Sequence, residues 1–324
     1  MPSRTPGIQG GRAAPINRER FTRTLTFWLR PAFALRVVNR FQRIAGFDRS
    51  MALASSMLTA MIPLAILCGA IVSHIGDKDI ADRVIDRYSL TAGGAAAVTQ
   101  LFSSAADTSV GIFGAVFLML STLSFARAVQ RLFEQTWELK PLSVRNTLND
   151  LKWSLSFVLY VPVSGWLYAN LGRGRFAVWV YLLEALLTAV FLVWGGWILA
   201  AKRVAWWDLL PFGVIGAVLA GVYSVGAAFY VPHLFNSYAA RFGTVGVVFA
   251  MLSAFFGIVL VVVGSAALGR EVHDELGRIR QGERPADDEV RREWDNVIGL
   301  ARERWQTARG QISRIRPARK SKRR

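Results

Sequence analysis

Residues 206–271 read WWDLLPFGVIGAVLAGVYSVGAAFYVPHLFNSYAARFGTVGVVFAMLSAFFGIVLVVVGSAALGRE, two apolar runs joined by a short polar turn. At a rise of roughly 1.5 Å per residue, each run is long enough to cross the roughly 30 Å hydrocarbon layer of a bilayer. Small residues recur at every fourth position in both runs, as Gly213, Ala217 and Gly221 and as Gly246, Ala250 and Ala254. Small side chains let membrane helices approach closely, although Gly and Ala are common in any membrane helix. We predict a packed membrane hairpin that uses these six residues.

The remaining apolar residues also fall in blocks. The 324 residues are 53% hydrophobic, yet the formal net charge is +17, with most of the charge outside the blocks. The predicted spans are about 51–75, 110–126, 153–171, 176–201, 208–231 and 243–269. This pattern predicts an all-α membrane protein with six transmembrane helices in a membrane domain of residues 48–270. We expect Pro63, Pro162 and Pro211 to kink the helices that contain them.

Charged segments flank this domain on both sides. In residues 1–47, a basic arm that we expect to begin with disorder, aromatic and apolar side chains alternate with arginines at helical spacing. That stripe predicts an amphipathic helix lying in the membrane interface, broken or bent at Pro31. Residues 271–324 form a charged tail, in which Val290, Trp294 and Trp305 fall on one helical face. Between the first two spans, 90–102 could be a re-entrant or interfacial helix rather than open loop.

The basic residues also predict an orientation. Most Lys and Arg lie in the two tails and in segments 127–152 and 202–208. The positive-inside rule therefore places both termini in the cytoplasm. Because the charge flanks the spans, we expect anionic lipid headgroups as partners and no nucleic acid. A homo-oligomer stays possible.

Glu184 is the most informative single residue, because it lies inside the fourth predicted span. A carboxylate at that depth is costly and usually faces a bundle interior or a water path. One interpretation is a side chain that contacts substrate or carries a proton. The other is a protonated glutamate hydrogen-bonded between two helices.

Three charged residues follow the second span in one helical register, Arg127, Arg131 and Glu134. They could clamp helices through ion pairs at the mouth of the bundle, or the guanidinium groups could bind phosphate headgroups. His233, which we place on the outer turn of the hairpin, could titrate near neutral pH or could simply be solvated.

Nothing in the chain predicts an enzyme. Only His74, His233 and His273 are present, on both predicted sides of the membrane, so we expect no metal site and no cofactor. The single cysteine, Cys68, excludes a disulfide within the chain. The motifs of common hydrolases, zinc proteases and ATP-driven pumps are missing from the sequence.

With these spans in order, the chain resembles the YihY/BrkB-like family of bacterial inner-membrane proteins, including its YhjD branch. The most specific match is SFARAVQRLFEQTW at 124–137, and ALASSMLTAMIPL at 52–64 resembles the first span of the family. Leu210, Pro211 and Gly213, and Tyr238 with RFGTVGVVF at 241–249, are further landmarks. The chain departs from the family at Ser265 and Ala266, where a Glu often occurs, although Glu271 lies nearby.

The resemblance implies a six-helix, multi-pass protein of the bacterial plasma membrane that is linked to envelope integrity. The family has also carried a ribonuclease label, which the lack of a histidine-rich metal motif argues against. Our leading hypothesis is a bundle that translocates or accommodates a lipid-like or small anionic substrate, using Arg127 and Arg131 at its cytoplasmic mouth and Glu184 within. The alternative is a structural membrane scaffold that transports nothing.

Overall fold

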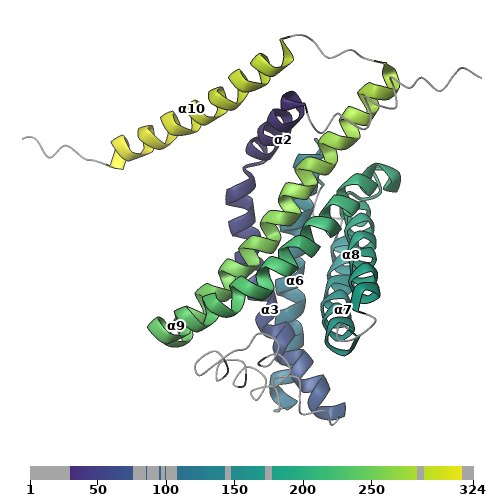
Figure 1. The fold of residues 1–324 in the computed structure, drawn as a ribbon. Helices are drawn as coiled ribbons and strands as arrows, with labels where there is room; N and C mark the ends of the chain where they lie inside the picture. The colour runs from purple at the N-terminus through teal and green to yellow at the C-terminus, as the bar shows by residue number, and fades with distance from the viewer. Residues whose placement is uncertain are drawn as a thin grey trace, which may run out of the picture. The chain divides into compact units, whose positions relative to one another are not determined.

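The computed structural model describes residues 30–75, 108–142, 147–171, 177–282 and 288–315, together with positions 85, 95 and 99. Within these residues the chain is helical and contains no strand (Figure 1). The helices are α2 Pro31–Arg43, α3 Gly46–Ile75, α6 Thr108–Thr136, α7 Thr147–Leu171, α8 Ala177–Leu199, the 3₁₀ turn η4 Trp206–Leu209, α9 Leu210–Gln281 and α10 Glu289–Ile315. The predicted N-terminal disorder, most of the interfacial helix and all of the possible re-entrant segment except positions 95 and 99 lie outside the described residues.

The chain forms two compact units. One comprises residues Val37–His273 and holds α3, α6, α7, α8 and most of α9. The other comprises Met1–Arg36 and Asp274–Arg324. In this second unit Arg36 pairs with Glu275 at 2.6 Å and also with Glu289 at the start of α10. Helix α2 begins at Pro31, where a missing amide N–H costs no helical hydrogen bond. The residues before Arg30, on which the predicted break at Pro31 depends, lie outside the described residues.

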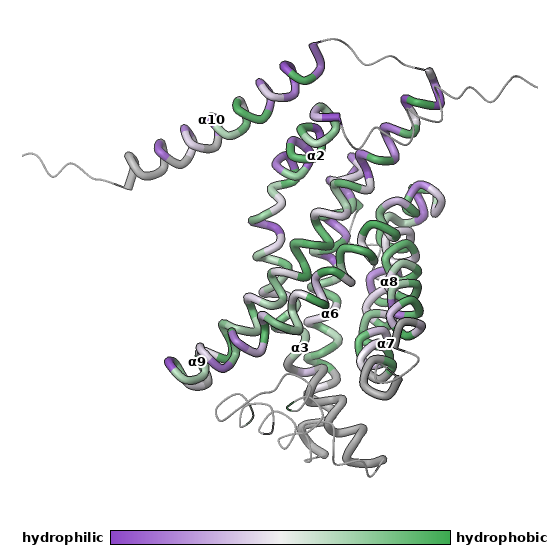
Figure 2. The backbone as a smooth tube through the Cα atoms, viewed as in Figure 1, coloured by the Kyte–Doolittle hydropathy of each residue, from purple (hydrophilic) through white to green (hydrophobic). Residues whose placement is uncertain are grey.

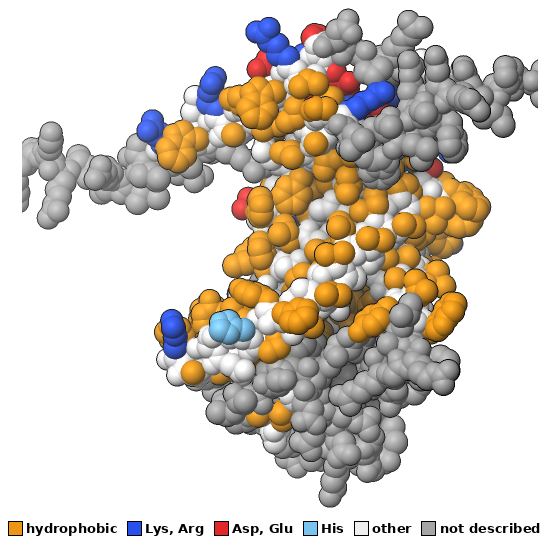
Figure 3. Space-filling model, viewed as in Figure 1, with side chains coloured by type: hydrophobic (Ala, Val, Ile, Leu, Met, Phe, Trp, Pro, Cys, Tyr) orange, Lys and Arg blue, Asp and Glu red, His pale blue; other side chains and the backbone are white. Residues whose placement is uncertain are grey.

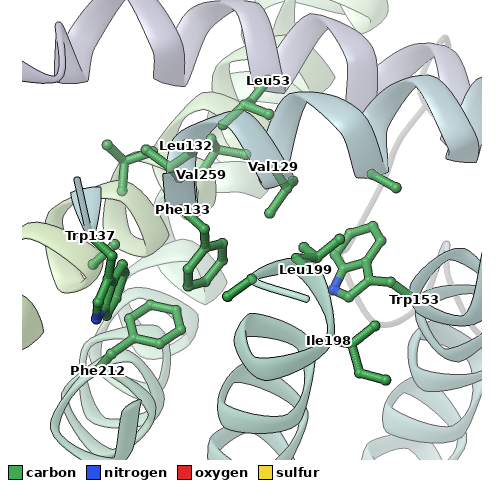
Figure 4. Close-up of a cluster of buried hydrophobic side chains, with 14 of the residues drawn as sticks. Leu53, Val129, Leu132, Phe133, Trp137, Trp153, Ile198, Leu199, Phe212 and Val259 are labelled. Carbon is green, nitrogen blue, oxygen red and sulfur yellow. The ribbon is translucent and has the colours of Figure 1, made fainter. Parts of the chain in front are cut away.

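The core of the larger unit is rich in aromatic side chains (Figure 4). Trp153 of α7 stacks on Phe157 with ring centroids 5.4 Å apart, and Phe125 of α6 packs against both rings. Phe133 stacks on Trp137 at 5.2 Å, and Phe212 of α9 meets both edge-on. Rings from three helices thus fill the space between them, and such pairs add about 0.5–1.5 kcal/mol each beyond the area that they bury.

Four segments in the described part of the chain are long and apolar enough to cross a membrane: Val116–Thr136, Trp179–Leu199, Trp206–Gly243 and Val245–Gln281. Apolar residues dominate α8 and α9 (Figure 2), and many of them, such as Phe229 at 80% exposure, are open to the surroundings of the protein (Figure 3). The predicted spans 51–75 and 153–171 lie in α3 and α7, which are not among the four. In α3, most side chains after Pro63 are outside the described set. In α7, serines, tyrosines and Pro162 lower the mean hydropathy.

The structure differs from the predicted polar turn after residue 231. Residues 232–242 are helical, and both Pro232 and His233 lie inside α9. The chain bends instead at Gly243, whose φ of 59° and ψ of −139° suit only glycine. Contacts between Phe212 and Gly269 and between Gly216 and Ser265 then bring the two halves of α9 together in antiparallel order.

The helices also extend beyond some predicted spans. Helix α6 runs on to Thr136 rather than ending near 126, and α9 continues past 269 to Gln281. Both extensions contain charged residues whose aliphatic neighbours still face the core. Hydropathy alone marks where the apolar run stops, not where the helix ends. Pro211 is the second residue of α9, where the first helical amides are unpaired anyway.

Candidate functional site

Glu184 lies on α8, within the segment Trp179–Leu199 that can cross a membrane, and is half-buried beside α7. The Ser164 hydroxyl of α7 donates a hydrogen bond to Glu184 Oε1 at 3.3 Å. One turn along α8, the Thr188 hydroxyl donates to the Glu184 carbonyl at 2.8 Å and also meets the Tyr160 hydroxyl at 2.9 Å. The four residues form a polar ladder between α7 and α8, defined here as Tyr160, Ser164, Glu184 and Thr188.

An apolar groove of about 260 Å³ lies along the same two helices. Its lining includes Tyr160 and Phe191, whose rings stack at 4.4 Å, together with Leu159, Val163, Leu187 and Val190. Leu159 and Val190 are more than half exposed, so the groove is open toward the surroundings of the bundle. Tyr160 belongs to both the groove and the polar ladder. The hydrogen bonds around the Glu184 carboxylate therefore lie next to an apolar surface.

A second polar region lies at the end of α6, where Glu134 is buried. Its Oε1 atom accepts hydrogen bonds from Gln130 Nε2 and from the Leu142 amide, both at 2.9 Å, and from Arg203 Nη2 at 3.4 Å. Arg203 also donates to the Lys140 carbonyl at 2.6 Å. Glu134 therefore ties the end of α6 to the chain that follows α8, and not to Arg127 or Arg131.

Arg127 pairs with Asp150 of α7, at 3.7 Å between Arg127 Nε and Asp150 Oδ2. Asp150 is buried, whereas Arg127 is about half exposed. Burial raises the pKa of the Asp150 carboxyl, and the Arg127 charge opposes that rise. The pair joins α6 to α7 but leaves a carboxyl that is easier to protonate than an exposed one.

The most buried carboxylate of this region is Glu271, which is 2% exposed. It pairs with Arg40 of α2, whose Nε lies 3.2 Å from Glu271 Oε2. Arg40 Nη1 also donates to the Thr136 carbonyl at 3.4 Å, so this guanidinium joins α2, α6 and α9. Sequence reasoning missed Arg40, Asp150 and Arg203 as site residues. The sequence did offer one signal for them, because a charged residue at a helix end next to an apolar run needs an ion-pair or hydrogen-bond partner.

The structure does not bring the three predicted mouth residues together, and it gives Arg131 an exposed position on α6. His233 is exposed on α9 and is helical, rather than part of the predicted outer turn. His273 lies nearer to an acid, with Nδ1 3.6 Å from Asp208 Oδ1. Among the described residues, no three His, Cys, Asp or Glu side chains gather where they could hold a metal ion.

The predicted small-residue stripes are used unevenly. Gly213 faces Val193 and the Ala189 carbonyl of α8, and Gly246 faces the Tyr238 carbonyl across the bend. Ala217 and Ala250 are buried, and the Ala254 carbonyl accepts a 2.5 Å hydrogen bond from Tyr223. Gly221 is exposed, and a methyl group added there would meet no described atom within 4 Å. Away from the bend, close approaches between the halves of α9 involve Gly216, Gly257 and Gly269.

Long apolar helices with an exposed apolar surface and polar groups gathered between them define an integral membrane protein. The chain matches the family described as virulence factor BrkB over residues 37–289, which is well over half of its length. It therefore belongs to the BrkB (YihY/BrkB) family, and the predicted family is confirmed. No curated protein and no solved structure matches the chain.

Proposed function

We propose that this protein spans the bacterial plasma membrane six times, with both termini in the cytoplasm. In this proposal the bundle accommodates or translocates a lipid-like or small anionic substrate and so supports the integrity of the envelope. The observation that carries the proposal is the polar ladder centred on Glu184. Glu184 lies inside a segment that can cross a membrane, and the ladder lies beside the groove between α7 and α8.

A carboxylate at the position of Glu184 makes insertion of the helix into the bilayer less favourable, and helix packing alone does not need such a group. Placing an ionisable side chain in a membrane-spanning helix costs up to about 2.5–3.5 kcal/mol on insertion scales, the value for the helix centre. The Ser164 hydroxyl of α7 donates a hydrogen bond to the Glu184 carboxyl group. Retaining an acid there is typical of a group that meets a polar part of a substrate or a proton during transport.

The groove beside the ladder suits the other half of a lipid-like substrate. Its lining is apolar, and it opens toward the region that lipid chains would occupy. A molecule with an apolar chain and an anionic head could lay the chain in the groove while its head passes the polar groups. At the predicted cytoplasmic end, arginines of α6 would attract that head.

Transbilayer movement of lipid tests the proposal directly. The purified protein is reconstituted in liposomes that contain a labelled anionic phospholipid, and the label that reaches the opposite leaflet is measured with time. We expect movement above that of empty liposomes for wild type and its loss in Glu184→Gln. The matched control is Ser253→Ala, which removes an exposed hydroxyl that bonds only to the Phe249 carbonyl of its own helix. Movement that is equal in empty liposomes and in wild type would contradict the proposal.

A structural scaffold is the second candidate function, favoured by the buried pairs Glu134–Arg203 and Arg40–Glu271, which link helices far apart in sequence. A strain that lacks the protein separates the two. If folded Glu184→Gln and Arg127→Ala variants restore the envelope as well as wild type does, the scaffold gains support. We keep the expectations that the chain is not an enzyme, needs no cofactor and binds no nucleic acid as predictions.

A further inference from the structure

Arg49, in the first turn of α3, carries an unused hydrogen-bond donor. Its Nε atom is buried and has no hydrogen-bond partner in the part of the chain that the structure describes. A buried donor without an acceptor destabilises the folded state, and more so when the group is charged. Most buried polar atoms are therefore satisfied, and an orphaned guanidinium nitrogen indicates an absent acceptor.

A second cation, Arg131, lies on the neighbouring helix α6. Helices α3 and α6 pack through one core cluster that contains Leu53, one turn after Arg49, and Leu132, which follows Arg131 (Figure 4). Burial lowers the pKa of the Arg49 guanidinium, and the positive charge of Arg131 lowers it further. Arg131 itself is exposed and forms no ion pair with any described residue. Arg49 and Arg131 therefore each neighbour a residue of the cluster through which α3 and α6 pack, and their like charges repel.

The neighbouring acids do not neutralise this pair. Glu134 is engaged by Gln130, Arg203 and a backbone amide, and Asp150 faces Arg127. Asp48 precedes Arg49 but is exposed and joins neither arginine in an ion pair among the residues described. The charge of Arg127, which the sequence placed in the predicted anion site, is already balanced by Asp150. The charges of Arg49 and Arg131 are not balanced by an ion pair with any described residue.

We propose that Arg49 of α3 and Arg131 of α6 together bind a phosphate group, carried either by a lipid headgroup or as free phosphate. Guanidinium forks match phosphate oxygens with paired, charge-assisted hydrogen bonds, which a spherical anion such as chloride cannot use. The half-buried Arg49 would supply its Nε donor from the protein side, and the exposed Arg131 would approach from solvent. Only the cytoplasmic location of this site rests on the proposed function.

Thermal unfolding of the full-length protein in detergent tests the site, with sodium phosphate compared against sodium chloride at equal ionic strength. We expect phosphate to raise the Tm of wild type by about 3 °C. In Arg49→Gln and Arg131→Gln the rise should fall below about 1 °C. The matched control is Arg241→Gln, which removes an exposed arginine beside the bend at Gly243 and should respond as wild type does. The control is needed because phosphate stabilises many proteins without binding.

A purely structural role for the arginines makes a different prediction. If the two cations only hold helices together, Arg131→Gln lowers Tm in chloride. If they form an empty anion site, Arg131→Gln leaves Tm unchanged or raises it, because repulsion with Arg49 disappears. Arg49→Lys keeps the charge but loses the fork, and we expect it to lose most of the phosphate response.

A lipid arm identifies the source of the phosphate group. Native mass spectrometry of the same variants with added phosphatidic acid, and with neutral diacylglycerol as comparison, measures retained lipid. Retention that depends on both arginines, without a response to free phosphate, supports a lipid headgroup. A phosphate response without retention supports the free anion. If wild type shows neither effect, or if both arginine variants match it in both, the site is overturned. Loss of lipid translocation with intact phosphate binding would instead count against the proposed function alone.

Discussion

Gly269 lies against the backbone of Phe212, so closely that a methyl group added at Gly269 would sit 2.5 Å from the Phe212 Cα atom. Phe212 is fully buried and is held by the rings of Phe133 and Trp137. Neither backbone has room to retreat. This contact fixes how near the two halves of α9 come at the end where the first half begins.

Gly269→Ala should therefore destabilise the protein by about 1–3 kcal/mol, because the methyl group forces the helices apart. Thermal or denaturant unfolding in detergent measures the change. Gly221→Ala is the matched control, since an added methyl group meets no described atom there, and the better helix propensity of alanine should leave stability unchanged or slightly higher. Equal effects at the two positions would contradict the packing role.

Removing Arg40 should expose the cost of a buried acid. In Arg40→Met the Glu271 carboxylate loses the guanidinium group 3.2 Å from it while it stays buried, and we expect a loss of about 3–5 kcal/mol. Arg292→Met is the control, because Arg292 and Asp288 form an exposed pair at the start of α10 worth at most about 0.5 kcal/mol. The double variant Arg40→Met with Glu271→Leu should recover much of the lost stability. A double variant that is less stable than Arg40→Met would show that the unpaired Glu271 carboxylate is not the source of the loss.

The Asp150 carboxyl makes the free energy of unfolding depend on pH, and the direction of this dependence can be predicted. Its pKa in the folded protein is raised above the ordinary value of 3.8, mainly by burial. Between that value and the higher native pKa, the folded protein binds more protons than the unfolded chain, so stability falls as pH rises. The stability of wild type relative to Asp150→Asn should decline across this window and be constant below and above it. A relative gain with rising pH would mean that Arg127 outweighs burial.

Glu184→Gln should separate stability from transport. The amide keeps the size of the side chain and can still accept from Ser164, so Tm should stay the same or rise, as often happens when a functional charge is removed. Lipid movement should nevertheless fall. Tyr160→Phe provides the comparison, because it removes the hydrogen bond to Thr188 at a cost of about 0.5–1.5 kcal/mol and leaves the acid in place. A Glu184→Gln variant that is unstable and inactive together would favour the structural interpretation.

The apolar blocks predicted where membrane helices lie, because bilayer thickness sets a minimum length that hydropathy can detect. The ends of these helices were predicted less accurately. Thr136 and Gln281 end helices that continue beyond the apolar run, since a helix needs a hydrogen-bonded backbone and not an apolar side chain at every turn. Pro232 did not end a helix, because a single proline is tolerated in a membrane segment.

The partners of the charged residues were harder to predict. The register of Arg127, Arg131 and Glu134 described one helix correctly, but each partner comes from another part of the chain, Asp150 for Arg127 and Arg203 for Glu134. The same limit explains the glycines. Which face of α9 meets its other half depends on the rotation of the chain at Gly243, and a repeat of four residues cannot give that rotation.

The pair formed by Arg40 and Glu271 joins residues 231 positions apart. A ribosome that adds roughly 5–20 residues per second needs roughly ten to fifty seconds to make the chain between them. Throughout that time Arg40 has been synthesised and Glu271 has not. Until α9 is made, the guanidinium of α2 must stay hydrated, contact lipid phosphate or use partners made earlier, such as the Thr136 carbonyl of α6. Closure of the membrane domain is consequently a late event in biosynthesis, set by the last turns of α9.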